Sequence, residues 1–166
     1  ATPAIIGTFD TPGDALDVYV VGNYAYVADG SAGLQIINIS TLPPLLVGSL
    51  DTPGSAEGVH VAGGLAFVAD GSGGLRIIDV STTPAFPSDV GQYPMSTALG
   101  VYVSNKLAYV AEYDSGLQII DVATPTNPAL RTSYDTPAGA RGVFVEGPYA
   151  YVADDFDGLQ IIELEP

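Results

Sequence analysis

The chain has 166 residues, 47% of them hydrophobic, and 19 acidic residues against four basic ones give a formal net charge of −15. This length suffices for one domain with a core, and the apolar content excludes a disordered chain. The negative charge disfavours nucleic-acid binding, no apolar run is long enough for membrane insertion, and the lack of cysteine excludes zinc–thiolate sites.

In chain order, the first unit begins with an apolar, β-branched stretch that ends at the turn Asp-Thr-Pro-Gly, residues 10–13. Alternating apolar residues then predict a second strand, and the pair Gly22–Asn23 suits a tight hairpin turn. Two more strands follow, joined by a short loop rich in Gly and Asp and closed by a Pro-rich connection. The predicted strands of this unit span residues 5–9, 18–20, 25–28 and 34–37.

The segment 25–37 recurs three times along the chain. Its copies begin at Ala66, Ala108 and Ala150, at offsets of 41, 42 and 42 residues. Four short antiparallel strands in such a period are typical of a β-propeller blade, whereas helical repeats would need long windows free of Pro and Gly. We therefore predict an all-β propeller of four-stranded antiparallel blades, four per chain, in a single domain over residues 1–166.

The run Tyr-Val-Ala-Asp…Gly-Leu-Gln-Ile-Ile-Asp-Val-Ser resembles the LVIVD repeat, and its best copies span residues 66–81 and 108–122. The resemblance implies a propeller fold. Because that family is known mainly from bacterial surface or secreted proteins, it also implies a secreted or cell-surface location. It implies no particular activity and no catalytic residues.

The predicted strand 5–9 completes a blade whose other three strands lie at the far end of the chain, within residues 140–164. Pairing these segments removes two exposed sheet edges. In cis the pairing gives a monomeric four-bladed ring, and in trans it gives a head-to-tail homodimer of eight blades. Small residues in the inner strands favour the eight-bladed ring, although a crowded four-bladed axis also needs them.

One acidic residue follows the third strand of every unit: Asp29, Asp70, Glu112 and Asp154. The simplest interpretation is structural, because Asp binds nearby backbone N–H groups in turns and each blade needs the same turn. The alternative is calcium, the one cofactor considered, because oxygen ligands cluster in the last two units although the EF-hand spacing is missing. The calcium candidates are Glu112, Asp114, Asp154, Asp155 and Asp157.

Positions at which the units differ are the better candidates for ligand binding. One position at the start of the innermost strand varies in charge and polarity: Leu16, Glu57, Leu99 and Arg141. Asp17 stands where the other units have glycine, and Tyr113 and Phe156 lie at the tips of the last two loops. Aromatic tips beside acids are suited to stacking a sugar or gripping a peptide, although ordinary loop variation leaves the same pattern.

No catalytic constellation is evident. His60 is the single histidine, and its equivalents are aromatic, which favours a packing role. We therefore expect a non-catalytic binding or interaction scaffold that uses the loop face at the channel mouth, with a protein or glycan ligand and a second copy of the chain as partners. Two alternatives stay open: a lectin-like carbohydrate-binding module, with or without calcium, and a hydrolase or lyase with a carboxylate pair at the mouth.

Overall fold

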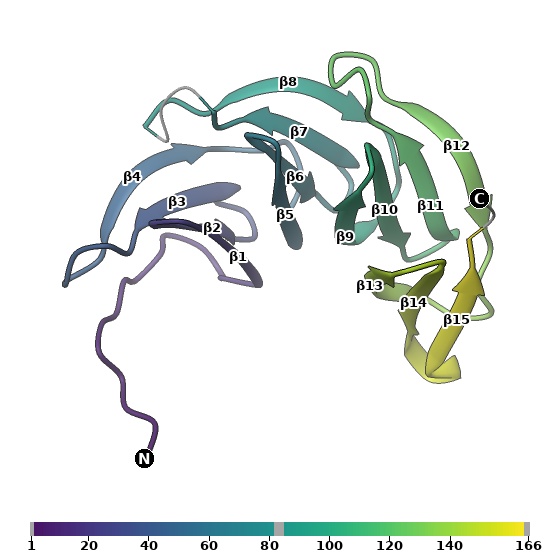
Figure 1. Ribbon diagram of the computed structural model, residues 1–166, viewed down its shortest axis with the longest axis horizontal. Helices are drawn as coiled ribbons and strands as arrows, with labels where there is room; N and C mark the ends of the chain where they lie inside the picture. The colour runs from purple at the N-terminus through teal and green to yellow at the C-terminus, as the bar shows by residue number, and fades with distance from the viewer. Residues whose placement is uncertain (1, 82–84, 165–166) are drawn as a thin grey trace.

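The computed structural model describes residues 2–81 and 85–164 as four antiparallel β-sheets, arranged as blades along an open arc (Figure 1). Three sheets have four strands and the last has three. In each sheet, strands that are consecutive in the chain pair with one another. The prediction of an all-β chain with four propeller blades is confirmed.

The strands of each blade run in chain order from the concave side of the arc to its outer side (Figure 1). Blade 1 contains β1 (Asp17–Val21), β2 (Tyr24–Ala28), β3 (Leu34–Asn38) and β4 (Leu45–Leu50). Blade 2 contains β5 (Gly58–Ala62), β6 (Leu65–Ala69), β7 (Leu75–Asp79) and β8 (Ser88–Tyr93). Blade 3 contains β9 (Ala98–Ser104), β10 (Leu107–Glu112), β11 (Gly116–Asp121) and β12 (Ala129–Tyr134). Blade 4 contains β13 (Ala140–Glu146), β14 (Tyr149–Asp154) and β15 (Leu159–Glu163).

Helix is almost absent from this fold. Within residues 2–81 and 85–164 the one helix is a single 3-10 turn, Asp155–Asp157, and no helix is long and apolar enough to cross a membrane. The tight turns between the first two strands of each blade use left-handed residues, as their sequences predict. In blade 3, Asn105 and Lys106 both adopt positive φ, at 51° and 64°.

The hydrophobic core consists of similar clusters, each formed between two neighbouring blades. Between blades 1 and 2, Leu34 and Ile36 of β3 are fully buried and pack in one cluster with Val59 and Val61 of β5. The next two blade boundaries repeat this arrangement with equivalent residues. Burial of each such side chain contributes about 1.5–3 kcal/mol, so the blades stabilise one another rather than folding separately.

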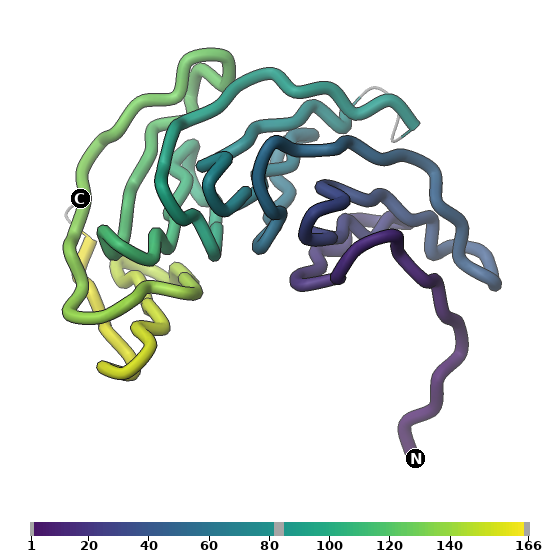
Figure 2. The backbone as a smooth tube through the Cα atoms, turned by 180° about the vertical axis from the view of Figure 1, so that it is seen from behind, coloured from purple at the N-terminus to yellow at the C-terminus, as the bar shows by residue number. Residues whose placement is uncertain are grey.

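The two ends of the arc do not meet in this structure. Blade 4 lacks a fourth strand, and residues 5–9, which the sequence predicts to be a strand, belong to no sheet. They run from blade 1 as an extended tail, because the blade that they were expected to complete lies at the opposite end of the arc (Figures 1 and 2). Residues 1, 165 and 166 of the predicted domain lie outside the described residues.

Candidate functional site

One face of the arc carries the loop that precedes each innermost strand and the loop that joins the two middle strands. These loops lie together because the strands are antiparallel: β1 begins at Asp17, which is paired with Ala28 at the end of β2. We call this surface the loop face. It comprises residues 10–16, 29–33, 51–57, 70–74, 94–97, 113–115, 135–139 and 155–158.

A buried carboxylate ties the two loops of each blade together. In blade 2 the Thr52 hydroxyl donates to Oδ1 of Asp70 at 2.5 Å, and the Gly54 amide donates to Oδ2 at 2.9 Å. The same pair of bonds joins Thr11 and Gly13 to Asp29, and Thr136 and Ala138 to Asp154. In blade 3 the Ser96 hydroxyl and the Thr97 amide both donate to Oε1 of Glu112. The residues are structural, but the donors named here lie on the loop before the innermost strand and not in the turn that follows the carboxylate, as the sequence suggested. Glu112 also accepts from Ser115 of its own loop.

The pKa values of two of these carboxyl groups are shifted in opposite directions. Burial raises the pKa of Asp70, and the hydrogen bonds from Thr52 and Gly54 offset part of that effect. For Glu112, burial also acts to raise the pKa, but hydrogen bonds from serine hydroxyls and backbone amides outweigh it and the pKa is lowered. A raised carboxyl pKa marks catalytic acids in clefts, but the Asp70 side chain is fully buried with both oxygens occupied.

The five acidic residues considered for calcium do not form one cage. Asp154 and Glu112 are used in the loop bonds, Asp114 accepts from the Thr97 hydroxyl at 3.2 Å, and Asp155 faces Arg141. Within the described ranges, no three His, Cys, Asp or Glu residues are grouped as metal ligands. The calcium hypothesis therefore has no assembled site in this geometry.

Two of the variable residues meet at the boundary of blades 3 and 4. The Arg141 guanidinium lies 5.2 Å from the centre of the Tyr113 ring and donates to Oδ2 of Asp155 at 3.1 Å. The Tyr113 hydroxyl donates to the same oxygen at 3.2 Å. Gly139 backs the ring so closely that a Cβ there would collide with it. We call Tyr113, Arg141 and Asp155 the charged cluster.

Sequence reasoning selected Tyr113 and Arg141 separately but missed that Asp155 and Gly139 join them. Asp155 was considered only as a metal ligand. A usable signal was present at Gly139, because the equivalent residues of the other units are Asp14, Ser55 and Thr97. A glycine confined to one repeat indicates a local close approach.

The other variable residues do not converge on this cluster. Phe156, directly after Asp155, is 93% exposed, and Leu16 at the other end of the arc is 51% exposed. Glu57 and Leu99 are half-buried at the starts of their strands. The seven candidates therefore do not form one site: Tyr113 and Arg141 are in contact, and Phe156 lies next to them only as the residue that follows Asp155 in the chain.

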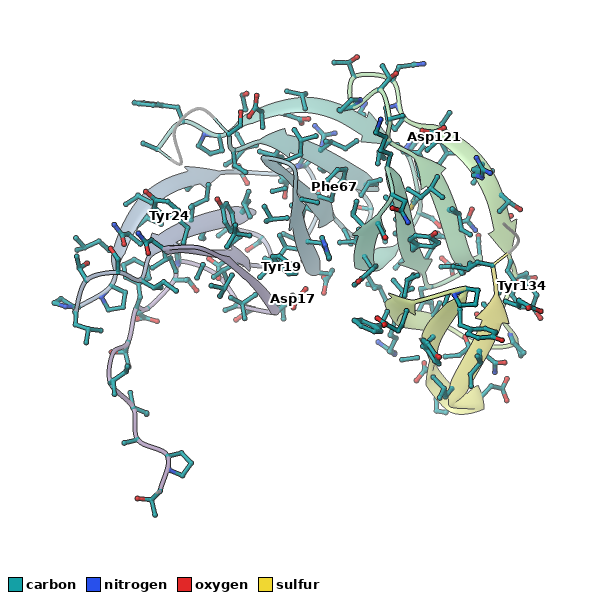
Figure 3. All side chains as sticks on the ribbon, in the orientation of Figure 1. Asp17, Tyr19, Tyr24, Phe67, Asp121 and Tyr134 are labelled. Atoms are coloured by element: carbon teal, nitrogen blue, oxygen red, sulfur yellow. The ribbon has the colours of Figure 1, made fainter. Side chains whose placement is uncertain are left out.

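Asp17 has a bond to the neighbouring blade instead of a free position at the mouth. Its Oδ2 accepts from the Val59 amide at 2.9 Å, and Figure 3 shows it at the inner end of β1. At the next two boundaries the equivalent residues are Gly58 and Gly100, whose added Cβ atoms would lie 2.7 Å and 2.8 Å from backbone carbonyl oxygens of the following blade. Both residue types bring the innermost strands close together.

An aromatic row runs along the innermost strands. Ring centres are 4.4 Å apart between Tyr19 and His60, 4.8 Å between His60 and Tyr102, and 5.0 Å between Tyr102 and Phe144. His60 is buried, and burial lowers its pKa, partly offset by the charge of Asp17. Its position in this row agrees with the packing role inferred from sequence.

Comparison with known proteins gives one family and several similar structures. The family model described as the LVIVD repeat matches residues 12–52, 53–94, 97–136 and 138–164. No curated protein matches the sequence. The crystal structure of the computationally designed Ika4 protein is similar over 99% of this chain and 100% of that one, with a TM-score of 0.73 and 10% identity.

The crystal structure of the computationally designed Ika8 protein is similar over 90% of this chain, with a TM-score of 0.68 and 10% identity. The matched part is 46% of the Ika8 chain, so this chain spans less than half of its length. At this level of identity the two likenesses concern the fold alone.

Proposed function

This chain belongs to the LVIVD-repeat family, and from that premise we propose that it is a non-catalytic binding module for a protein or peptide segment. The binding surface is the charged cluster together with Phe156, on the loop face of blades 3 and 4. The observation that carries the proposal is the exposure of Phe156, at 93%, directly beside an ordered Arg–Asp–Tyr arrangement.

The composition of this surface is that of a protein-binding hot spot. Tyr and Arg are enriched among the residues whose truncation costs most in interfaces, and an exposed aromatic side chain is a natural anchor for a partner's pocket. Arg141, with its side chain 56% exposed, retains donors that Asp155 does not use. A cluster held in place before binding loses less entropy when the complex forms.

The shape of the surface favours a macromolecule over a small substrate. Small-molecule sites are concave and enclose most of the ligand, whereas Phe156 protrudes from its loop. Two cavities of the molecule lie elsewhere: one lies beside the end of β15, and the other borders the hairpin turns at Gly63 and Lys106, on the opposite face.

The enzyme alternative has less support from the geometry. Asp29, Asp70 and Asp154 have both carboxylate oxygens occupied by hydrogen bonds within the loops, and His60 lies between Tyr19 and Tyr102. A general acid or base must reach the substrate proton within hydrogen-bond distance. These groups have no free approach to a substrate on the loop face.

Carbohydrate binding is the second candidate, because Phe156 offers one free aromatic face beside acidic residues. Tyr113 offers less, since Arg141 covers its ring and Gly139 approaches it closely. Single-ring stacking without a second enclosing wall makes this candidate weaker than a peptide ligand.

The test is selection of peptides from a display library against the immobilised chain, in parallel with a glycan array. We expect peptides that bind the wild type and lose roughly 10-fold or more in affinity with Phe156→Ser or Arg141→Gln. Phe86→Ser is the matched control, because Phe86 is 78% exposed but lies on the connection after β7, away from the loop face. Glycan binding sensitive to Phe156→Ser would favour the second candidate, and peptides equally sensitive to Phe86→Ser would overturn the assignment of the surface.

A further inference from the structure

We propose that two copies of this chain join head to tail and close an eight-bladed ring, each copy supplying residues 5–9 as the fourth strand of the partner's blade 4. The proposal is independent of the ligand that the loop face binds. It rests on the placement of the tail, on the side chains exposed at the two ends of the arc, and on the incomplete sheet of blade 4.

The tail already lies against blade 1 in the place that an outer strand takes against the following blade. Phe9 packs on Ala25, Val27 and Ile37 of blade 1. Its equivalent, Leu50 at the end of β4, packs on the cluster between blades 1 and 2, which contains the equivalent three residues: Ala66, Val68 and Ile78. Phe9 therefore occupies the position of the last residue of an outer strand.

A second contact gives the same placement independently. A Cβ on Gly7 would lie 2.8 Å from Cδ2 of Leu42, in the loop after β3. Gly91 of β8, its equivalent by sheet register, abuts Pro125, which is the equivalent of Leu42 in the loop after β11. The tail thus follows the course of an outer strand. The other three strands of its blade would have to precede blade 1, and this chain places none there.

The two ends of the arc, blade 4 and blade 1, expose complementary parts of the interface that repeats between blades. In blade 4, Leu159 and Ile161 are 62% and 60% exposed, and in blade 1, Val18 and Val20 are 57% and 54% exposed. Their equivalents inside the arc are buried against each other: Leu34 0%, Ile36 0%, Val59 3% and Val61 7%. Joining the two ends therefore buries four exposed apolar side chains in an interface that the chain already forms between its own blades.

The innermost strand of blade 4 also lacks the contacts with a following blade that the other innermost strands make. Phe144 ends the aromatic row and is 52% exposed, so the partner's Tyr19 is the residue that continues it. Gly142 meets only the Cβ of Ala153, at 3.8 Å, whereas Gly58 and Gly100 each face the backbone of a following blade. Gly142 thus faces no following blade within this chain and would face the partner's β1 in the ring.

A cavity lies where the loop that leads from β15 into the missing fourth strand would run. It has a volume of about 560 Å³ and is lined by residues of β10, β11 and β12 and by residues 162–164 at the end of β15. Thr132 of β12, which lines it, is equivalent by register to Gly7, and Gly7 is covered by Leu42 and Pro44. The partner's Pro3 is equivalent to Pro44 and enters this space when the partner's tail pairs with β15.

The expected register follows from blade 1. There Leu34 pairs with Leu50, Gln35 with Ser49 and Ile36 with Gly48. By equivalence, Leu159 pairs with the partner's Phe9, Gln160 with the partner's Thr8, and Ile161 with the partner's Gly7. Because the two ends of one arc lie apart, this pairing joins two chains, and a two-fold ring leaves no unpaired end (Figures 1 and 2).

Light scattering with chromatography tests the assembly. We expect a mass of about 34 kDa for the wild type, twice the 17.0 kDa of one chain. Ile161→Asp should give a folded species of 17.0 kDa, because this side chain is exposed in the single arc and buried in the ring. Phe86→Asp, also on an exposed apolar residue but in blade 2, away from both ends of the arc, is the control and should keep the larger mass. A wild-type mass of one chain at micromolar concentration would overturn the proposal.

Cysteine cross-linking tests the register, and the native chain contains no cysteine to interfere. Directly paired residues of antiparallel strands have Cα atoms close enough for a disulfide. Thr8→Cys with Gln160→Cys should therefore give a covalent dimer on oxidation, while Thr8→Cys with Asp157→Cys should not. A disulfide formed within a single chain would show closure in cis, and a ladder of larger products would show open chains; either result would refute the eight-bladed ring.

Discussion

Replacing Thr52 by valine should lower the free energy of unfolding by about 2 kcal/mol at pH 7. The Thr52 hydroxyl donates to the Asp70 carboxylate at 2.5 Å, and both side chains are buried. A hydrogen bond to a charged group contributes about 1.5–3 kcal/mol, and valine keeps the shape of threonine, so the loss reports the bond rather than a cavity. For a domain of this size the loss corresponds to a fall in Tm of roughly 4–8 °C.

The effect of Thr52→Val should also depend on pH. Burial already raises the pKa of Asp70, and loss of a donor to the ionised form raises it further. In the folded variant the Asp70 carboxyl therefore keeps its proton to a higher pH than in the unfolded chain. The stability of the variant falls as pH rises from the unfolded pKa of this carboxyl to the folded one. The difference from the wild type is therefore largest at pH 7 and shrinks toward acid pH.

Chemical unfolding followed by circular dichroism, at one protein concentration and at several pH values, measures both effects. Thr136→Val is a replicate, since the Thr136 hydroxyl donates to Asp154 at 2.6 Å in an equivalent buried site. Thr126→Val is the control, because Thr126 is exposed on the connection after β11. A loss for Thr52→Val within about 0.5 kcal/mol of this control at pH 7 would refute the role given to the buried carboxylate.

Four further predictions follow from the same geometry. Burial lowers the pKa of His60, so the folded chain binds fewer protons than the unfolded chain as pH falls below ~6.5, and its free energy of unfolding decreases there. His60→Tyr removes this group and should flatten the dependence of stability on pH between about pH 5 and 7. Gly58→Ala should cost roughly 1–3 kcal/mol in thermal unfolding, because its Cβ would lie 2.7 Å from the Leu99 carbonyl oxygen, whereas Gly142→Ala should leave single-chain stability unchanged and weaken the dimer in dilution experiments. Arg141→Gln should leave the midpoint of chemical unfolding unchanged, because its ion pair with Asp155 is exposed, and a clear loss would mean that the charged cluster is a stabilising element. Calorimetric titration of the chelated chain with millimolar calcium should show no saturable heat, since the acidic residues of the last two blades are not grouped, and a saturable heat would restore the calcium hypothesis.

The blades were predictable because each repeat encodes its own meander. The spacing of the copies of residues 25–37 predicted four sheets, and the boundaries of β3 differ from the predicted strand by a single residue. Local patterns suffice for this level of structure, since strand alternation and tight turns are properties of neighbouring residues.

Contacts between loops and between blades were not predictable in the same way. The sequence gives no sign that Asp70 accepts from Thr52, 18 residues earlier, because that bond depends on the return of the chain to the same face. Likewise, Arg141, Tyr113 and Asp155 meet only once blades 3 and 4 are placed side by side. The tail at residues 5–9 has strand character but lacks a paired strand, since pairing depends on the position of blade 4.

The glycines at the inner blade boundaries have a consequence for stoichiometry. The ends that we propose to join are unlike each other, and a unit with unlike ends can add copies without limit, as filaments do. The curvature of the arc limits how many copies can be added before the ring closes. At Gly58 and Gly100 an added Cβ would collide with the backbone of the following blade, so a side chain there would push the inner strands apart and reduce the angle between successive blades. Larger residues at these positions should therefore straighten the arc and favour open chains of copies over the closed ring that we propose.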